Sequence, residues 1–443
     1  MRNALLAFLM AAHLICATPV HPASSAQPAE FVMDNGMKVL ILEDHKSPLA
    51  IFQVWYKVGS VDEPTGRQGI SHLLEHMMFK GTKRYAQKEI SRLVQKNGGI
   101  LNAYTSFDKT VYWELMPSDR IGLAIEIEAD RMRNLLMDDA MTASERSVVM
   151  EERRMRTEDD PQSAMYESLL AASFDVHPYG QPIIGWMDSL AAIGRDELYE
   201  HYRKFYSPDN ALVVVVGDVD TASVYKLIKK RFGRIPAYKG KRTSYIVAEP
   251  PHSATRRVTL VREAELPFLA ILWHTPNFAS DDAYALEVFA HILSSGKSSR
   301  LYQSMIYESR LAINVDADYS GLMRYPFVFT LDATAAPNVT PEALEDALLA
   351  EIDKLSSEGP TPEELQRALN GMEAGYIMGQ DSIMTKASLL GSAELQAGDW
   401  RFMERYLDGI RKVTAEDVMR VGRTYLGRDR MDAGLLLPKE KRQ

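Results

Sequence analysis

Cysteine is almost absent from this chain of 443 residues. The only cysteine, Cys16, lies near the N-terminus within an apolar leader, and the remaining chain has no thiol. Disulfide bonds and thiolate metal sites are therefore excluded beyond the leader. Any metal ion bound there must be held by histidine and carboxylate side chains.

Basic charge and long apolar runs are also scarce. The net charge is −9, and acidic and basic residues are interleaved along the chain. Proteins that bind nucleic acid usually carry a basic stripe, so no nucleic-acid partner is expected. Beyond the leader no apolar run is long enough to cross a bilayer, which predicts no stable membrane insertion.

The N-terminus has the pattern of a secretory signal peptide. Arg2 precedes an apolar run from Ala4 to Ala17, and the small-residue stretch "HPASSAQPAEF" follows. This pattern predicts a signal peptide over residues 1–26, cleaved after Ala26. An exported protein whose remaining chain has no cysteine fits a bacterial periplasm, which is the predicted location.

Beyond the leader, strand and helix patterns alternate, and the chain divides into two predicted domains. "VMDNGMKVLILED" predicts a hairpin at its Asn-Gly turn, and Thr142 is the predicted cap of a helix that starts near Ala143. "IPAYKGKRTSYIVAEPPHSATRR" is rich in proline, glycine and lysine and lacks helical periodicity. The predicted division is a first domain over 27–237, a linker over 238–250 and a second domain over 251–443.

The second half repeats the first. "PLAIFQVWYKVGSVDEPTGRQGISHLLEH" aligns without a gap with "PFLAILWHTPNFASDDAYALEVFAHILSS", and strand, polar loop and helix follow in the same order. In this alignment His72 pairs with His291, but Glu75 and His76 pair with Ser294 and Ser295. The second copy is therefore predicted to keep the scaffold and to lack a complete metal motif.

His72, Glu75 and His76 in "SHLLEHMMFKGT" are the candidate metal-site residues. Positions i and i+4 lie on one face of a helix, so both histidines can present ring nitrogens to one ion. Zn²⁺ accepts such nitrogen and oxygen donors in tetrahedral geometry. The competing interpretation is a plain amphipathic helix, since Leu73 and Leu74 belong to a core face.

The third ligand is expected in the carboxylate-rich stretch "ASERSVVMEERRMRTEDDP". Glu145 and Glu152 are two helical turns apart and share a face, whereas Glu151 points elsewhere. Either Glu145 or Glu152 could complete a His₂Glu site. The other could then orient one of the ligands through a hydrogen bond without touching the metal ion. By itself the stretch also fits a solvated helix held by salt bridges.

Together these motifs resemble the M16 metallopeptidases, the pitrilysin–insulinase–mitochondrial processing peptidase family, whose inverted zinc motif is His-x-x-Glu-His. "GISHLLEHMMFKGT", "GGILNAYTSFDKTVYWE", "ERSVVMEERRMRTEDDP", "HPYGQPIIG" and "YSPDNALVVVVGD" follow in the family's order, and the size resembles the short-subunit branch. The resemblance implies an α+β fold of two homologous domains. Each domain would be an antiparallel sheet packed with helices, and the two would enclose a chamber, as in the M16/LuxS-like metallohydrolase fold.

The resemblance also implies roles for individual residues in a zinc-dependent endopeptidase. His72, His76 and Glu152 would bind one Zn²⁺ per chain. Glu75 would be the general base of peptide hydrolysis, and Glu145 would orient a zinc ligand.

The implied substrates are peptides or unfolded polypeptides. Asn102 and Ala103 would lie on an edge strand that pairs with an extended peptide.

The chain departs from the family where the second domain usually supplies an Arg and a Tyr. In "LYQSMIYESRLAINVD" the Arg position falls on Ile306 and the Tyr position on Ile313, and neither side chain can donate a hydrogen bond. Arg300 and Tyr307 have the same spacing, but they lie one helical segment too early and are interpreted as a coincidence.

This departure leaves two hypotheses. In the first, the chain is the zinc-bearing subunit of a heterodimer, and a homologous M16 subunit supplies the Arg and Tyr. In the second, it is a non-catalytic structural or assembly subunit with a vestigial zinc site. The complete set of His72, Glu75, His76 and Glu152 favours the first.

Overall fold

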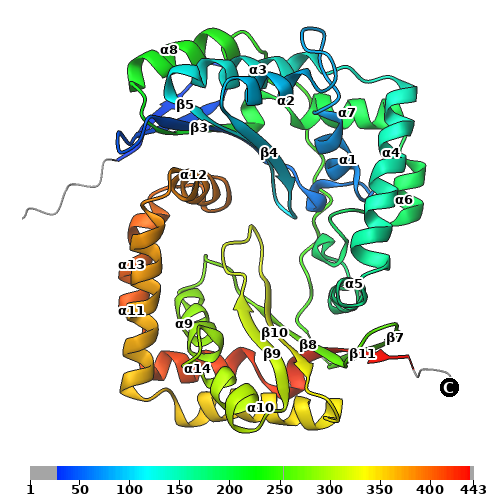
Figure 1. The fold of residues 1–443 in the computed structure, drawn as a ribbon, viewed down its shortest axis with the longest axis vertical. Helices are drawn as coiled ribbons and strands as arrows, with labels where there is room; N and C mark the ends of the chain where they lie inside the picture. Colours follow the sequence, from blue (N-terminus) through cyan, green and yellow to red (C-terminus); the bar gives the residue numbers. More distant parts are fainter. Residues whose placement is uncertain (1–26, 253, 440–443) are drawn as a thin grey trace, which may run out of the picture.

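The computed structural model describes residues 27–252 and 254–439 of the chain. They form two β-sheets at opposite ends of the molecule, each backed by helices, with further helices connecting the two ends (Figure 1). The predicted signal peptide, residues 1–26, lies outside the described residues. Within them, no helix combines the length and apolar character that a membrane span requires.

The first sheet has six strands in the order β1-β2-β6-β3-β5-β4. Their bounds are Ala29–Val32 for β1, Lys38–Glu43 for β2, Leu49–Tyr56 for β3, Ile100–Thr105 for β4, Thr110–Pro117 for β5 and Ala211–Gly217 for β6. β1 and β2 pair as the predicted hairpin, and Gly36 in its turn has a φ of 87°, which favours glycine. The helices whose apolar side chains share the core on one face include α1 (Ile70–Met77), α3 (Ile121–Asn134), α7 (Arg195–Phe205) and α8 (Thr221–Phe232).

The second sheet has five strands in the order β7-β11-β8-β10-β9. Their bounds are Arg256–Arg262 for β7, Phe268–Thr275 for β8, Ala312–Tyr319 for β9, Phe327–Ala335 for β10 and Met431–Pro438 for β11. The helices whose side chains share its main core include α9 (Asp282–Ser294), α10 (Pro341–Glu358) and α14 (Ala415–Tyr425).

Apart from β1, which has no counterpart in the second sheet, the two sheets share one strand topology, and this confirms the two homologous α+β halves. β3 and β8 begin and end at positions that the sequence alignment pairs, Leu49 with Phe268 and Tyr56 with Thr275. The edge strand β4 has its counterpart in the edge strand β9. Each sheet is antiparallel, as expected, except for one parallel pair, β2–β6 or β7–β11. The strands of each parallel pair are far apart in the sequence, with three other strands of the same sheet between them.

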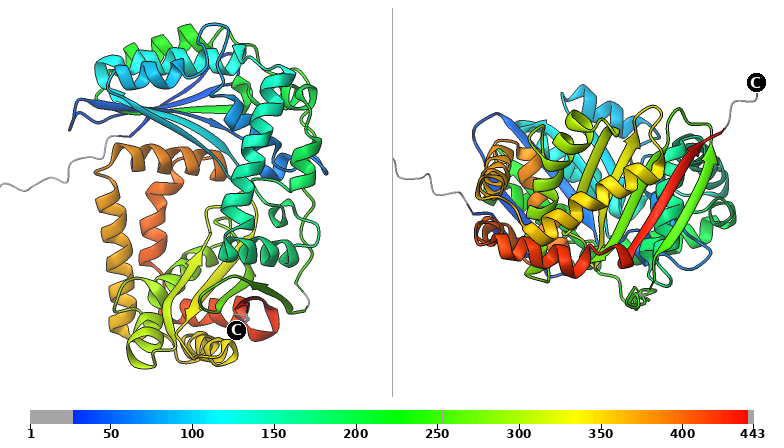
Figure 2. Two further views of the ribbon diagram at one scale, coloured as in Figure 1. Left: turned by 45° about the vertical axis from the view of Figure 1, so that its right-hand side comes forward. Right: turned by 90° about the horizontal axis from the view of Figure 1, so that it is seen from below.

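Each half also covers the second face of the other half's sheet. α12 (Ile383–Ser392) from the second half packs on β3 and β6, where Ala387 and Leu390 join a buried cluster around Trp55. α5 (Pro161–Ser173) from the first half packs on β7, β8 and β11 through Met165 and Leu169. Figures 1 and 2 show both helices between the two sheets. The halves are therefore interlocked, which the sequence analysis did not predict.

The remaining helices run along the sides of the molecule between the sheets (Figure 1). They are α4 (Asp139–Arg153), α6 (Met187–Ala192), α11 (Pro362–Gly379) and α13 (Phe402–Arg411). The short α2 (Glu89–Lys96) lies next to β4. Residues 238–250, the predicted linker, form neither helix nor strand. The limits 27–237 and 251–443 stay our proposed domain boundaries.

Asp138, and not Thr142, caps the helix that carries the carboxylate-rich stretch. The Asp138 side chain accepts a hydrogen bond from the Met141 backbone N–H at 2.7 Å, and α4 begins at Asp139. Thr142 lies inside the helix, where its hydroxyl donates to the Asp138 carbonyl. The predicted cap was therefore wrong by one turn, because aspartate caps helices at least as well as threonine.

We predict that Gly391→Ala weakens the interlock between the halves. A Cβ at Gly391 in α12 would lie 2.2 Å from the Trp55 ring, so the helix would have to move off the first sheet. Overpacking of this kind typically costs about 1–3 kcal/mol of unfolding free energy. Gly375→Ala in α11 is the matched control, because nothing lies within 4 Å of its Cβ. Urea unfolding should show a loss for the first variant only, and unchanged stability of Gly391→Ala would contradict the close approach.

Candidate metal centre

Helix α1 places the motif histidines on one side and its apolar residues on the other. The helix begins after Gly69, whose φ of 93° and whose approach to the Ile184 carbonyl both require glycine. Leu73 and Leu74 are fully buried in the core. The opposite side of α1 faces α4.

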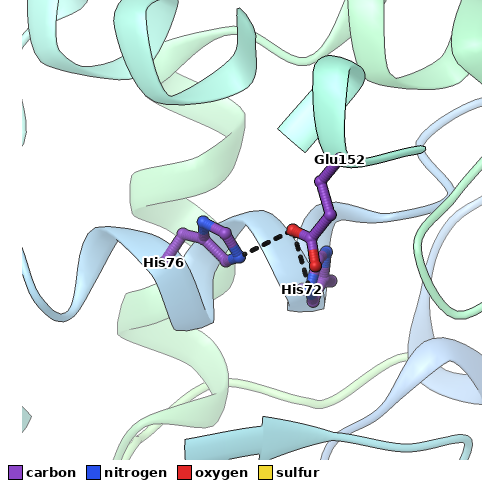
Figure 3. Close-up of side chains that lie close together, drawn as sticks. All are labelled: His72, His76 and Glu152. Carbon is purple, nitrogen blue, oxygen red and sulfur yellow. Dashed lines mark ion pairs between the residues drawn. The ribbon is translucent and has the colours of Figure 1, made fainter. Parts of the chain in front are cut away.

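His72, His76 and Glu152 converge between α1 and α4 (Figure 3). Glu152 Oε2 lies 3.2 Å from His76 Nε2 and 3.9 Å from His72 Nε2. One donor atom of each residue lies within 4.8 Å of the other two. Two imidazoles and a carboxylate are a donor set that zinc accepts, so these residues fit a bound zinc ion.

Glu145 and Lys80 lie behind His76. Glu145 Oε1 lies 2.9 Å from His76 Nδ1, and Lys80 pairs with the same carboxylate. This contact orients the His76 ring and leaves Nε2 facing Glu152. By contrast, His72 Nδ1 is buried and has no hydrogen-bond partner among the described residues. The sequence left two candidates for the third ligand, Glu145 and Glu152. In the structure Glu152 lies next to both histidines, whereas Glu145 contacts only His76.

Glu75 is buried beside the cluster and is held by the edge strand. The Thr105 hydroxyl of β4 donates to Glu75 Oε2 at 2.6 Å. Burial raises the pKa of Glu75, while the Thr105 hydrogen bond and the nearby His76 oppose that rise. A carboxylate whose pKa is raised toward neutrality is better suited to accept and return a proton.

The carboxylates of the site attract positive charge. Burial lowers the pKa of His76, but its contacts with Glu145 and Glu152 outweigh burial and raise that pKa to about 9. Burial, together with the neighbouring His76, lowers the pKa of His72 to about 4. The hydrogen bond with His76 lowers the pKa of Glu152. The site therefore keeps Glu152 ionised and His72 neutral, which are the states in which both can bind a metal ion.

The edge strand β4 runs beside α1 and carries the two predicted substrate-contact residues, Asn102 and Ala103. β4 pairs only with β5, so its other side is an open edge within the described residues. Asn102 Oδ1 accepts the Ala103 backbone N–H at 2.9 Å. An open edge of this kind can add an extended peptide as a further strand.

The second half has no equivalent of the metal cluster at the aligned positions. A cavity of about 890 Å³ lies along α9, the counterpart of α1, and its lining includes His291, Ser294 and Ser295. None of the residues lining this cavity belongs to the His72–His76–Glu152 cluster.

The two positions in the second half where the family usually has an Arg and a Tyr carry isoleucine, which cannot donate a hydrogen bond from its side chain. Ile306 lies in a π-helical segment, Tyr302–Glu308, and Ile313 lies on β9 with 54% of its surface exposed. Arg300 donates two hydrogen bonds of 2.8 Å to the Glu364 carboxylate and a third to a backbone carbonyl. Arg300 is therefore engaged in a structural ion pair.

Three residues at the site escaped the sequence analysis, namely Lys80, Thr105 and Arg156. Arg156 Nη1 lies 2.9 Å from Glu152 Oε1, one turn further along the chain. Lys80 likewise follows His76 by four residues, so helical spacing is a signal that could have found both. Thr105 had no such signal, because a strand brings it to Glu75.

Two descriptions of one peptidase family match the chain. Residues 38–186 match the family description "Insulinase (Peptidase family M16)", and residues 192–372 match "Peptidase M16 inactive domain". The chain is 30% identical over 397 residues to "Zinc protease PqqE" of Helicobacter pylori, covering 89% of each protein. It is 32% identical over 433 residues to an uncharacterized zinc protease of Mycobacterium tuberculosis, covering 95% of each.

Solved structures show the same fold. The crystal structure of a protease from Helicobacter pylori has a TM-score of 0.90 at 29% identity, covering 93% of this chain and 100% of that one. A putative M16-like peptidase from Alicyclobacillus acidocaldarius has a TM-score of 0.81 at 22% identity, covering 94% of this chain and 99% of that one.

We predict that Glu145→Gln weakens zinc binding without removing a donor. The amide keeps a weak contact with His76 Nδ1 but loses the charge that fixes the ring, and such changes typically cost about 10–100-fold in metal affinity. Glu151→Gln is the matched control, because Glu151 lies on the same helix, is 60% exposed and pairs only with Arg154. Competition with a chromophoric chelator measures both affinities. Equal affinities for the two variants would contradict the role of Glu145.

Proposed function

This chain belongs to peptidase family M16, and on that premise we propose that it is the zinc-bearing subunit of an endopeptidase. The observation that carries the proposal is the convergence of His72, His76 and Glu152 beside Glu75 and the open edge of β4. Relatives that are named zinc proteases support it. The family description "Peptidase M16 inactive domain" matches residues 192–372, which lie mostly in the second half, and it agrees with one metal motif per chain.

His72, His76 and Glu152 would hold the zinc ion, and the contact of Glu145 with His76 Nδ1 fixes one of the rings. When bound, zinc supplies Lewis-acid polarisation of the scissile carbonyl. Glu75 accepts a proton from the attacking water and returns it to the leaving amine. Thr105, bonded to Glu75 Oε2, keeps this carboxylate in place and leaves its other oxygen for the proton.

The substrate is an extended peptide that pairs with β4. Backbone hydrogen bonds along the edge bind any sequence in an extended conformation, so unfolded polypeptides suit this site better than folded proteins. Asn102 and Ala103 lie on the part of the edge that contacts the peptide backbone.

The active form is a heterodimer. Ile306 and Ile313 provide no hydrogen-bond donor for the oxyanion that develops on the scissile carbonyl, so a homologous subunit supplies an Arg and a Tyr. The two chains enclose one chamber around the site. Export to the periplasm is part of the proposal, and it rests on the signal-peptide pattern of residues 1–26.

We predict that Glu75→Gln keeps its zinc and loses peptide hydrolysis. Glutamine cannot accept the proton of the attacking water, and loss of a general base typically costs about 10²–10⁴-fold in rate. Elemental analysis and cleavage of an unstructured fluorogenic peptide by the assembled enzyme measure the two properties, with Glu151→Gln as the charge-matched control. A Glu75→Gln enzyme that retains most of its activity would rule out this mechanism.

We predict that the purified chain alone binds zinc but cleaves peptides poorly. Loss of one oxyanion donor typically costs about 10²–10³-fold in turnover. Adding a homologous subunit with Arg and Tyr at the equivalent positions should restore activity. The double change Ile306→Arg and Ile313→Tyr should restore part of it without a partner.

Two results would contradict the heterodimer. Full activity of the chain alone would mean that another residue supplies the donor, with Arg300 and Tyr307 the first pair to replace. Inactivity with every partner, despite bound zinc, would favour the non-catalytic assembly subunit instead.

A further inference from the structure

A second cluster of two histidines and one acid lies in the second half. His252 precedes β7, His274 lies on β8 and Asp432 lies on β11, which runs between β7 and β8 (Figure 2). One donor atom of each residue lies within 4.8 Å of the other two. The donor types and the spacing are therefore those of the first cluster, but the cluster lies on a different part of the fold.

Asp432 gives the strongest indication that this cluster binds a ligand. Its side chain is fully buried, Oδ1 accepts the Arg256 backbone N–H at 2.9 Å, and Oδ2 has no hydrogen-bond partner among the described residues. The Arg256 guanidinium does not compensate its charge, because it bonds the Ala172 carbonyl and Asp175 instead. A buried carboxylate is costly unless a cation or a metal ion balances it.

The His252 ring approaches Asp432 without forming a hydrogen bond to it. His252 Nε2 lies 3.0 Å from Asp432 Oδ1, yet this nitrogen makes no hydrogen bond with any described group. The two rings stack with their centroids 5.1 Å apart.

His274 is held in the tautomer that a ligand requires. Its Nε2 lies 2.9 Å from the Ser173 carbonyl, and a carbonyl can only accept, so this nitrogen carries the proton. Nδ1 therefore offers a lone pair to a ligand. A ring nitrogen donating to a backbone carbonyl is the usual support of a metal-binding histidine.

We propose that His252, His274 and Asp432 form a second metal site, for a divalent transition-metal ion of the zinc type. Two imidazoles and a carboxylate suit zinc. In a tetrahedral zinc site the donor atoms lie about 3.4 Å apart, and the His252–Asp432 pair is already at 3.0 Å. A plain ion pair between His252 and Asp432 would not involve His274 and would leave Asp432 Oδ2 without a partner atom to bind. The expected metal content of the chain rises from one ion to two.

The position of the site assigns it a structural role. His252 follows the linker 238–250, and Ser173 is the last residue of α5, the helix that the first half lays on the second sheet. His274 aligns with Trp55, which packs under the crossing helix α12 in the other sheet. The ion would cross-link the end of the linker to β8 and β11, next to the C-terminal end of α5.

Zinc stoichiometry of the full-length, untagged chain tests the site. Elemental analysis after gel filtration should give two zinc ions for the wild type and one for His76→Ala. It should give none when Asp432→Asn is added, because the amide still accepts the Arg256 N–H but does not balance a metal ion. His76→Ala with His291→Gln should keep one zinc, since His291 lies in the second half outside the cluster.

The outcomes separate this site from the proposed catalytic one. If His76→Ala removes no zinc while Asp432→Asn removes one, the second site stands and the catalytic assignment fails. If His76→Ala holds no zinc in a direct zinc titration, the second site is refuted. Metal content unchanged by both Asp432→Asn and His274→Gln would also refute it.

Proteolysis provides a test that needs no substitution in the cluster. In His76→Ala, trypsin cleavage between residues 238 and 257 should slow about tenfold when zinc is present at ten times its Kd, compared with a chelator. Binding to the closed form suppresses local opening by that factor. Equal cleavage rates with zinc and with chelator would overturn the proposal that the ion braces the linker.

Discussion

The burial of each sheet on both faces is the constraint on which the rest of the structure depends. β6 and most of β8 are near-continuous apolar runs whose residues are buried on both sides, so each sheet needs a covering layer on each face. Each half supplies only one such layer from its own helices. The second layer comes from the other half, through α12 on the first sheet and α5 on the second. Neither half can therefore bury its own sheet alone.

This constraint also fixes the frame of the metal cluster. α4 carries Glu145 and Glu152 and continues through a π-helical segment, Arg154–Glu158, toward α5, whose position is set by the second sheet. α1 is fixed from the other side by the core of the first sheet. The distance between the two histidines and Glu152 thus depends on packing in both halves, although all three residues belong to the first. A chain of paired charges, from Lys80 through Glu145 and His76 to Glu152, completes the site.

The sequence predicted those parts of the fold and site that depend on local spacing. Two histidines four residues apart and two glutamates seven apart had to lie on shared helix faces, and the structure has them there. The repeat of strand and helix could be recognised in the sequence because the two copies align without a gap. What could not be predicted depends on contacts between distant segments. Thr105 reaches Glu75 from a strand, and α5 and α12 each pack on the sheet of the opposite half. The cap at Asp138 is a different, local case, because Asp138 and Thr142 lie one turn apart and both residue types cap helices well.

The cluster of His252, His274 and Asp432 belongs to the same class of distant contacts, since its members come from three separate segments. One of its members nonetheless lies at a position that has an equivalent in the first sheet. Trp55 and His274 occupy equivalent positions in the two sheets, and each faces the helix that crosses from the other half. At Trp55 the crossing helix approaches through Gly391, so the contact is apolar and tight. At His274 the helix has ended at Ser173, so a backbone carbonyl faces the ring and the contact is polar. A metal ion there would supply the cohesion that apolar packing supplies at the equivalent point of the first sheet.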